Sequence, residues 1–266
     1  MSGHAFQGSA PENYERYLVP LIFSDYASDL AGLVPFPTGA RVLEVACGTG
    51  AATAALLDAA PAGAHVTATD LSDDMIRMVN DRFDDNRIAV QTADGTDLPF
   101  GTSSFDALVC AFGVMFYPDR MKGYAEAARV LKPGGTFALS VWDSHEHNPY
   151  AALTHETLGQ LFPENPPMFL TVPFGYYDTD AIAAELEEAG FTEILISRRP
   201  RQSKAPNAVG IARGFVLASP VAGEIAAQTD DLENVIATVG EALEARYGER
   251  DLAAPMQAIL ITALAR

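Results

Sequence analysis

Two acidic residues and a pair of glycines form the part of this sequence best suited to binding a ligand. The run Glu44-Val45-Ala46-Cys47-Gly48-Thr49-Gly50 ends a valine-rich apolar stretch with two glycines. Glycines at a strand-to-helix turn let a ligand approach the backbone closely, and the helix start behind them offers free N–H groups and a positive dipole end. Asp70 follows Gly50 by twenty positions, at the end of the next apolar stretch. A carboxylate there can accept hydrogen bonds from both hydroxyls of a ribose, so the spacing indicates a ligand that contains a nucleoside.

Glu44 and the histidines are the other candidates for chemistry. Glu44 lies inside the apolar stretch, and a buried carboxylate needs partners. These partners can be a ligand or the backbone of the glycine loop. His145 and His147 follow the last strand of the alternating pattern, and His145 is the candidate catalytic base because histidine titrates near neutral pH. A polar surface loop is the other interpretation of these two residues.

Composition narrows the class of protein. The formal net charge is -18, from 35 acidic and 17 basic residues, which disfavours nucleic acid and anionic membranes as partners. Neither Cys47 nor Cys110 forms a C-x-x-C pair, and carboxylates do not cluster, so we expect no metal site and no disulfide. The first eleven residues lack the apolar core of a signal peptide, and no run is long enough to span a bilayer. We therefore expect a cytoplasmic protein with a small-molecule substrate and no membrane insertion; the oligomeric state stays open.

Strands and helices must alternate to position these residues. Short apolar runs predict strands, and amphipathic runs that begin at capping residues or end at Gly and Pro predict the helices between them. Strict alternation favours a mostly parallel sheet with helices on both faces, which binds ligands at the carboxyl ends of its strands. The seven predicted strands are 41–47, 65–69, 87–93, 105–111, 136–142, 191–197 and 256–265.

The flanking segments predict a helical cover for the sheet. Residues 14–34 have helical spacing, residues 208–228 are mostly apolar but contain Pro220, and residues 230–247 predict an amphipathic helix that packs against the sheet. We divide the chain into an N-terminal helical lid (1–38), a ligand-binding core (39–143), a lid insertion with strand six (144–228), and a terminal helix and antiparallel strand that complete the core (229–266).

The stretch from Arg41 to Trp142 resembles class I S-adenosylmethionine-dependent methyltransferases. Five motifs match in order and spacing: Val42 to Gly50; Asp70-Leu71-Ser72 with Met75; Ala93-Asp94-Gly95; Leu98-Pro99-Phe100 before Ser104-Phe105-Asp106; and Arg129 to Gly135. The segment from Cys110 to Asp119 is similar to that of the small-molecule subgroup, methyltransferase type 11, which includes the ubiquinone and menaquinone methyltransferases. Many members of that subgroup have glutamine where this chain has Ala111.

The resemblance implies a Rossmann-like fold and S-adenosylmethionine as cofactor, with S-adenosylhomocysteine as product. It implies that Glu44 helps to hold the amino group of the cofactor, that Asp70 binds the ribose, and that Asp94 accepts a hydrogen bond from the adenine. The full set of expected cofactor-binding residues is Tyr14, Glu44, Ala46, Gly48, Gly50, Asp70, Leu71, Met75, Ala93, Asp94, Gly95 and Cys110.

Aromatic residues outside the motifs indicate an apolar or aromatic substrate, although they could equally form the core of the lid. In the subgroup a tyrosine near the N-terminus closes over the cofactor, a role open to Tyr14 or Tyr17. The expected substrate-contacting residues are Tyr17, Phe112, Met115, Trp142 and Phe174.

Three alternatives to a small-molecule methyltransferase remain. An NAD-dependent dehydrogenase would use the same glycine turn but wants a third glycine where this chain has Thr53. A nucleic-acid methyltransferase would use a motif similar to Asn165-Pro166-Pro167-Met168, which here follows the fifth strand instead of the fourth. A protein of this fold that binds the cofactor without methyl transfer is the third alternative.

Overall fold

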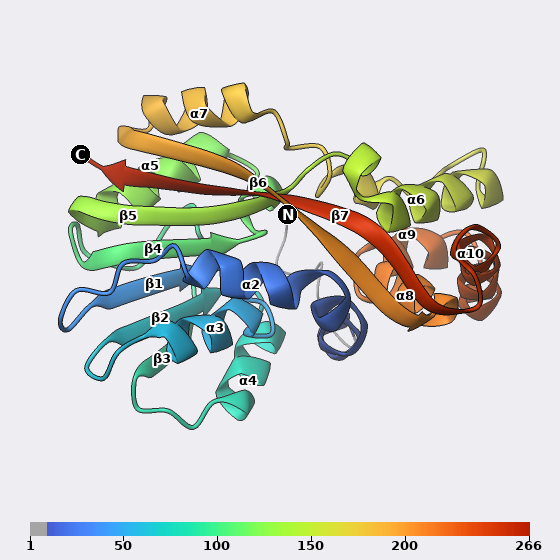
Figure 1. Cartoon of the computed structure of the whole chain (residues 1–266), viewed down its shortest axis with the longest axis horizontal. Helices are drawn as coiled ribbons and strands as arrows, with labels where there is room; N and C mark the ends of the chain where they lie inside the picture. The colour runs from blue at the N-terminus through green and yellow to red at the C-terminus, as the bar shows by residue number, and fades with distance from the viewer. Residues whose placement is uncertain (1–9) are drawn as a thin grey trace.

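The computed structural model describes residues 10–266 and contains one seven-stranded sheet (Figure 1). The strand order is β3-β2-β1-β4-β5-β7-β6, in which β7 is antiparallel to both of its neighbours and the other pairs are parallel. The expected mostly parallel, Rossmann-like sheet is therefore confirmed. Its strands are β1 (Arg41–Val45), β2 (His65–Asp70), β3 (Ile88–Thr92), β4 (Phe105–Ala111), β5 (Leu131–Trp142), β6 (Phe191–Asn207) and β7 (Arg250–Ala265).

The strand order reverses between β1 and β4, and this reversal places the ligand crevice. Because crossovers between parallel strands are right-handed, α3 (Ala51–Ala59) and α4 (Asp73–Arg82) lie on one face and α5 (Arg120–Val130) on the other. Helix α2 (Ser24–Ala31) packs beside α3, in front of the sheet in Figure 1, and α7 (Thr179–Glu188) packs on β6. A crevice forms at the carboxyl ends of the strands on either side of such a reversal.

The N-terminal cover starts with helix α1 (Ala10–Asn13) and continues as a π-helix, η1 (Tyr14–Phe23), before α2. At its end the backbone N–H of Ser24 donates to the carbonyl of Val19, five residues earlier. A π-helix has wider turns than an α-helix, and such turns are frequent at functional sites. The expected helical segment is present, but its residues face other directions than an α-helix would give.

Strands β6 and β7 are much longer than the runs predicted at 191–197 and 256–265. β5 ends at Trp142, opposite Ala258, while Pro200 to Asn207 continue to pair with residues 250–257. The two strands thus leave the sheet as a ribbon, drawn in orange and red in Figure 1. The apolar pattern did not predict this extension, because Arg198, Arg199 and Arg201 interrupt it in β6.

The ribbon reaches a helical lobe made of α6 (Pro149–Leu161), α8 (Ala208–Leu217), α9 (Val221–Ala226) and α10 (Leu232–Tyr247), at the right of Figure 1. The predicted helix over 208–228 is split at Pro220 into α8 and α9. α10 packs mainly on α8 and α6, so the expected packing of this helix against the sheet is wrong. An amphipathic helix shows the same pattern of apolar residues whether it packs on a sheet or on other helices. The domain boundaries drawn at residues 38, 143 and 228 stay predictions.

Three short 3-10 helices complete the structure: η2 (Val114–Phe116), η3 (His145–His147) and η4 (Phe169–Thr171). Between residues 10 and 266 no helix is both long enough and apolar enough to cross a bilayer. Residues 1–9, which carry most of the N-terminal stretch considered for a signal peptide, lie outside the described residues.

Candidate cofactor and substrate site

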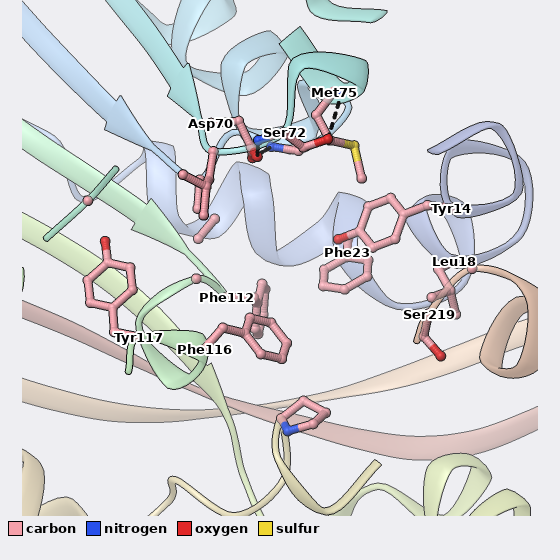
Figure 2. A pocket seen from close by; sticks show the side chains of 18 of the residues that line it. Tyr14, Leu18, Phe23, Asp70, Ser72, Met75, Phe112, Phe116, Tyr117 and Ser219 are labelled. Atoms are coloured by element: carbon pink, nitrogen blue, oxygen red, sulfur yellow. Dashed lines mark hydrogen bonds between the residues drawn. The ribbon is translucent and has the colours of Figure 1, made fainter. Parts of the chain in front are cut away.

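A cavity of about 230 Å³ opens at the carboxyl ends of β1, β2, β4 and β5 (Figure 2). Its walls come from parts of the chain that are far apart in sequence. The strand ends form its floor, η1 forms one wall, and the segment 169–174 together with the turn between α8 and α9 forms another. One end of the cavity is lined by carboxylates and glycines, and the other by aromatic rings.

The glycine loop bends the chain sharply after β1. Ala46, Gly48 and Gly50 have φ angles of 57°, 54° and 88°. A Cβ atom at Gly50 would lie 2.8 Å from the ring of Phe83, so the position admits only glycine. Ala46 adopts the same left-handed region at a cost of roughly 1–2 kcal/mol, and strain of this kind clusters at functional sites. The loop therefore brings Ala46 and Gly48 to the cavity wall.

Asp70 ends β2 and fixes the glycine loop. One carboxylate oxygen accepts a hydrogen bond from the N–H of Gly48 and the other from the N–H of Ser72, each at 2.9 Å. Each oxygen keeps a lone pair for a further donor, since a carboxylate has about four acceptor sites. Burial raises the pKa of Asp70, and the two N–H bonds oppose that rise. Asp70 thus orders the loop and can still receive two hydroxyls from the cavity.

Asp94 and Gly95 follow β3 at the same end of the cavity. One Asp94 oxygen accepts from the backbone N–H and the hydroxyl of Thr96, at 2.7 and 2.8 Å, which holds the carboxylate in place. A Cβ atom at Gly95 would overlap the hydroxyl of Tyr117, so this glycine lets the tyrosine ring close the cavity wall. The Asp94 carboxylate is therefore a fixed hydrogen-bond acceptor beside the flat ring of Tyr117.

Glu44 is fully buried behind the glycine loop. One of its oxygens accepts a hydrogen bond from the hydroxyl of Thr53 at 2.6 Å, while Oε1 has no partner among the described residues. Burial raises the pKa of Glu44 to about 8, and the Thr53 bond opposes that rise. An unpaired buried oxygen of this kind is suited to a cationic donor brought by a ligand.

The raised pKa of Glu44 makes the stability of the ligand-free protein depend on pH. Glu44 holds its proton in the folded protein up to about pH 8, whereas an unfolded glutamate loses it near 4.5, so ionisation favours unfolding. We expect Glu44 to lower the free energy of unfolding as pH rises from 5 to 8, by up to about 4 kcal/mol. In Glu44→Gln, which retains the acceptor for Thr53, this contribution should vanish. Urea unfolding at pH 5, 6.5 and 8 measures it; equal pH slopes in both proteins would contradict the assignment.

Aromatic rings build the opposite end of the cavity. Trp142, at the end of β5, stacks on Phe112 with ring centroids 4.2 Å apart. The ring centroid of Phe23, on η1, lies 5.2 Å from that of Phe112, and the ring centroid of Phe174 lies 5.8 Å from that of Trp142. Figure 2 shows Phe112 and Phe23 on the cavity side, facing Asp70 and Met75 across it. This end therefore favours a flat apolar group.

The structure brings most of the expected residues to this one cavity. Among the cofactor candidates, those that line it are Tyr14, Ala46, Gly48, Asp70, Leu71, Met75, Ala93, Asp94 and Gly95. Among the substrate candidates, those that line it are Phe112, Trp142 and Phe174. Glu44, Gly50, Cys110, Tyr17, Met115 and His145 are absent from the wall formed by the described residues.

Tyr17 and Cys110 show why some candidates lie elsewhere. In an α-helix Tyr17 would share a face with Tyr14, but the wider turn of a π-helix rotates it away. Tyr17 lines instead a separate surface groove beside Arg16 and Arg213. Cys110 is fully buried below the cavity floor, and burial raises the pKa of its thiol to about 12. Cys110 is therefore a neutral core group and no nucleophile.

His145 lies one aromatic layer behind the cavity. Its ring packs 4.8 Å from the ring of Phe174 and 5.5 Å from that of His155. Burial and the neighbouring His155 lower the pKa of His145, and its Nε2 has no partner among the described residues. A neutral imidazole behind Phe174 supports the wall of the site but does not face the reacting space.

Several lining residues had no place in the sequence prediction. Leu18 and Phe23 share the cavity face of η1 with Tyr14, and their spacing of four and five residues was the available signal. Tyr117 and Ser219 also line the cavity. The aromatic run after β4 pointed to Tyr117, whereas nothing in the local sequence marks Ser219, which arrives through the turn after α8.

Comparison with known proteins gives the chain a family context. Residues 43–139 match a family model described as a methyltransferase domain. The chain is 44% identical to a demethylmenaquinone methyltransferase from Clavibacter sepedonicus over 38% of this chain and 40% of that protein. It is 31% identical to a demethylmenaquinone methyltransferase from Renibacterium salmoninarum over 62% of this chain and 71% of that protein. The aligned region thus spans about two fifths of the first relative and more than two thirds of the second.

A solved structure is similar over nearly the whole chain. Phosphoethanolamine N-methyltransferase 2 from Haemonchus contortus, in complex with S-adenosyl-L-methionine, superposes with a TM-score of 0.59. The match covers 96% of this chain and 56% of that one at 17% identity. Identity at this level shows a common fold.

Proposed function

This chain belongs to the family of S-adenosylmethionine-dependent methyltransferases, and from that premise we propose that it methylates a small, apolar, aromatic molecule. The observation that carries the proposal is the two-ended cavity. A carboxylate-and-glycine end suited to a nucleoside continues into an end walled by Phe23, Phe112 and Trp142. A methyl group bound at their junction would face whatever the aromatic end holds.

The residues at the polar end fit S-adenosylmethionine. Asp70 retains acceptor capacity on both oxygens for the ribose hydroxyls, and Asp94 offers a fixed acceptor to the adenine amino group. The unpaired Oε1 of Glu44 lies behind the cavity wall, so we expect it to reach the ammonium group through a water. The glycine loop lets the cofactor approach closely, because Gly48 lines the cavity and carries no side chain.

The protein's part in the reaction is to orient the nucleophile and exclude water. When bound, S-adenosylmethionine supplies an electrophilic methyl group on a sulfonium. The aromatic walls hold a flat substrate, and placing the two reactants in contact can account for about 7–11 kcal/mol of the barrier. Apart from Asp70 and Asp94 at the cofactor end, the described residues that line the cavity include no charged side chain and no histidine. We therefore favour a nucleophile that ionises by itself or reacts through a lone pair, such as a phenol or a reduced quinone, over an alcohol.

Reduced quinones are the first substrates to test, because the two relatives compared above are demethylmenaquinone methyltransferases. Calorimetry of the purified protein with S-adenosylmethionine, S-adenosylhomocysteine and NAD tests the cofactor. We expect micromolar binding of the first two only. Transfer of a radiolabelled methyl group to naphthols and quinols, with aliphatic amines of equal size as controls, tests the substrate class. Methylation of the amines alone would overturn the aromatic assignment, and binding of NAD alone would favour the dehydrogenase.

We expect His145 to be dispensable for proton transfer. Because His145 lies behind Phe174 and is held neutral by burial, His145→Gln should lower kcat less than about tenfold, against 10²–10⁴ for the loss of a general base. The pH profile of kcat/KM should keep its shape. A hundredfold loss of kcat, together with loss of the limb near pH 6–7 in the pH profile of kcat/KM, would show that His145 is the base.

We also propose that the enzyme works in the cytoplasm and does not act on nucleic acid. Cys47 and Cys110 are both free and buried, which accords with a reducing cytoplasm. The net charge of -18 supports a small-molecule substrate over nucleic acid.

A further inference from the structure

A cluster of three side chains ties the N-terminal cover to the cofactor end of the cavity. The carboxylate of Glu15, on η1, accepts a hydrogen bond from the hydroxyl of Thr49 at 2.6 Å and from Nη1 of Arg82 at 2.9 Å. The same Arg82 nitrogen donates to the backbone carbonyl of Thr49 at 3.1 Å. We call this cluster of Glu15, Thr49 and Arg82 the latch. It joins η1, the glycine loop and the end of α4.

The latch is more than a surface ion pair. The side chains of Glu15 and Arg82 are 34% and 36% exposed, so the pair alone would contribute little. Thr49, however, is 1% exposed, and Glu15 is the acceptor for its buried hydroxyl. Leaving a buried hydroxyl without its hydrogen-bond acceptor costs the folded protein more stability than losing an exposed ion pair does. The contact therefore has a preferred closed geometry.

The residue next to the latch covers the cofactor loop. Tyr14 lines the cavity, and its Cε1 lies 4.0 Å from where a Cβ of Gly48 would be. A smaller cavity of about 30 Å³ between η1 and the glycine loop is lined by Tyr14, Gly48 and Thr49 as well. Figure 2 shows the Tyr14 ring opposite Asp70 and Met75. With the latch closed, a ligand on the loop would have Tyr14 above it.

We propose that Glu15 and Arg82 are positioning residues that hold Tyr14 over the cofactor and thereby slow its dissociation and that of the product. This inference rests on the proposed function, since it assumes that the cavity binds S-adenosylmethionine. Release of the ligand requires η1 to lift from the glycine loop, and lifting breaks the contacts of Glu15 with both Thr49 and Arg82. The lifetime of the complex then depends on side chains outside the cavity wall.

The sole tryptophan provides the readout. Trp142 is the only tryptophan in the chain and lines the cavity, so its fluorescence in stopped flow can follow S-adenosylhomocysteine leaving the protein. Glu15→Gln should raise the dissociation rate about tenfold, the equivalent of one hydrogen bond to a charged group. The matched control is Glu12→Gln, on an exposed position of α1. It removes the same charge and should leave the rate unchanged.

A double-mutant cycle tests whether Glu15 acts through Tyr14. In a Tyr14→Leu background the rate should already be raised, and adding Glu15→Gln should raise it little further. Arg82→Met should raise the rate in the wild-type background. In steady state, Glu15→Gln should raise KM for S-adenosylmethionine without lowering kcat, whereas a general loss of structure would lower kcat as well.

The outcomes separate the two proposals. If the wild-type protein binds neither S-adenosylmethionine nor S-adenosylhomocysteine, the proposed function fails and the latch proposal fails with it. If wild type binds and Glu15→Gln has the wild-type dissociation rate, only the latch proposal is overturned. An equal increase in Glu12→Gln, or a full additional increase on top of Tyr14→Leu, overturns it too.

Discussion

Replacing Asp70 by alanine is expected to weaken cofactor binding severely. Asp70 can accept two hydroxyl hydrogen bonds from a ribose while it holds the N–H groups of Gly48 and Ser72. Two hydrogen bonds to a charged acceptor contribute about 3–6 kcal/mol together, so the Kd for S-adenosylmethionine should rise about 10²- to 10⁴-fold. Disorder of the glycine loop adds to the loss. Isothermal titration calorimetry measures the change.

Two variants separate binding from folding at this position. Asp70→Asn keeps the shape of the side chain but turns one acceptor into a donor facing a backbone N–H, so it should bind more weakly than wild type and more tightly than alanine. Asp58→Ala removes an exposed carboxylate on α3 and should bind as wild type does. A wild-type Kd for Asp70→Ala would show that the ribose is held elsewhere.

Replacing Trp142 by alanine is expected to give the largest loss of stability. The indole is 2% exposed and lies among the rings of Phe23, Tyr26 and Phe112, at centroid distances of 5.5, 5.6 and 4.2 Å. Truncating a buried tryptophan to alanine costs about 3–5 kcal/mol through lost burial and the cavity left behind. Urea unfolding followed by circular dichroism measures it, since the variant lacks its fluorophore.

The same substitution tests the substrate wall. Trp142→Phe, which keeps an aromatic surface, should recover most of the stability and a KM close to wild type for an aromatic substrate. Trp142→Ala should raise that KM even at temperatures where it stays folded. If alanine leaves both stability and KM unchanged, the ring cluster is neither packed nor part of the substrate site.

The gathering of the expected cofactor residues at one end of the cavity was predictable because these residues are attached to strand ends. Ala46, Asp70 and Asp94 each lie within two residues of the end of a parallel strand. Once alternation predicts a parallel sheet, those ends meet at one edge whatever the rest of the chain does. Glu44 was recognisable for another reason, since a carboxylate inside an apolar strand needs a partner. The structure supplies one in Thr53, the residue that occupies the third glycine position of a dinucleotide fingerprint.

The substrate end depends on packing between segments that the sequence does not place. His145 follows β5 closely, yet Phe174 lies between it and the cavity. α10 has an amphipathic face that would suit the sheet, but the long β6–β7 ribbon carries the lobe away, and α10 packs on α8 and α6.

The sequence by itself thus determined the sheet, the family and which polar residues gather at one end of the cavity, because period, turn residues and motif spacing act over short stretches of chain. Only the tertiary structure decided which aromatic rings face the cavity, that η1 is a π-helix which turns Tyr17 away from Tyr14, and that Glu15 meets Thr49 and Arg82. The two contacts of Glu15 join residues 34 and 67 positions apart. Their geometry follows from how whole elements pack, which no local pattern encodes.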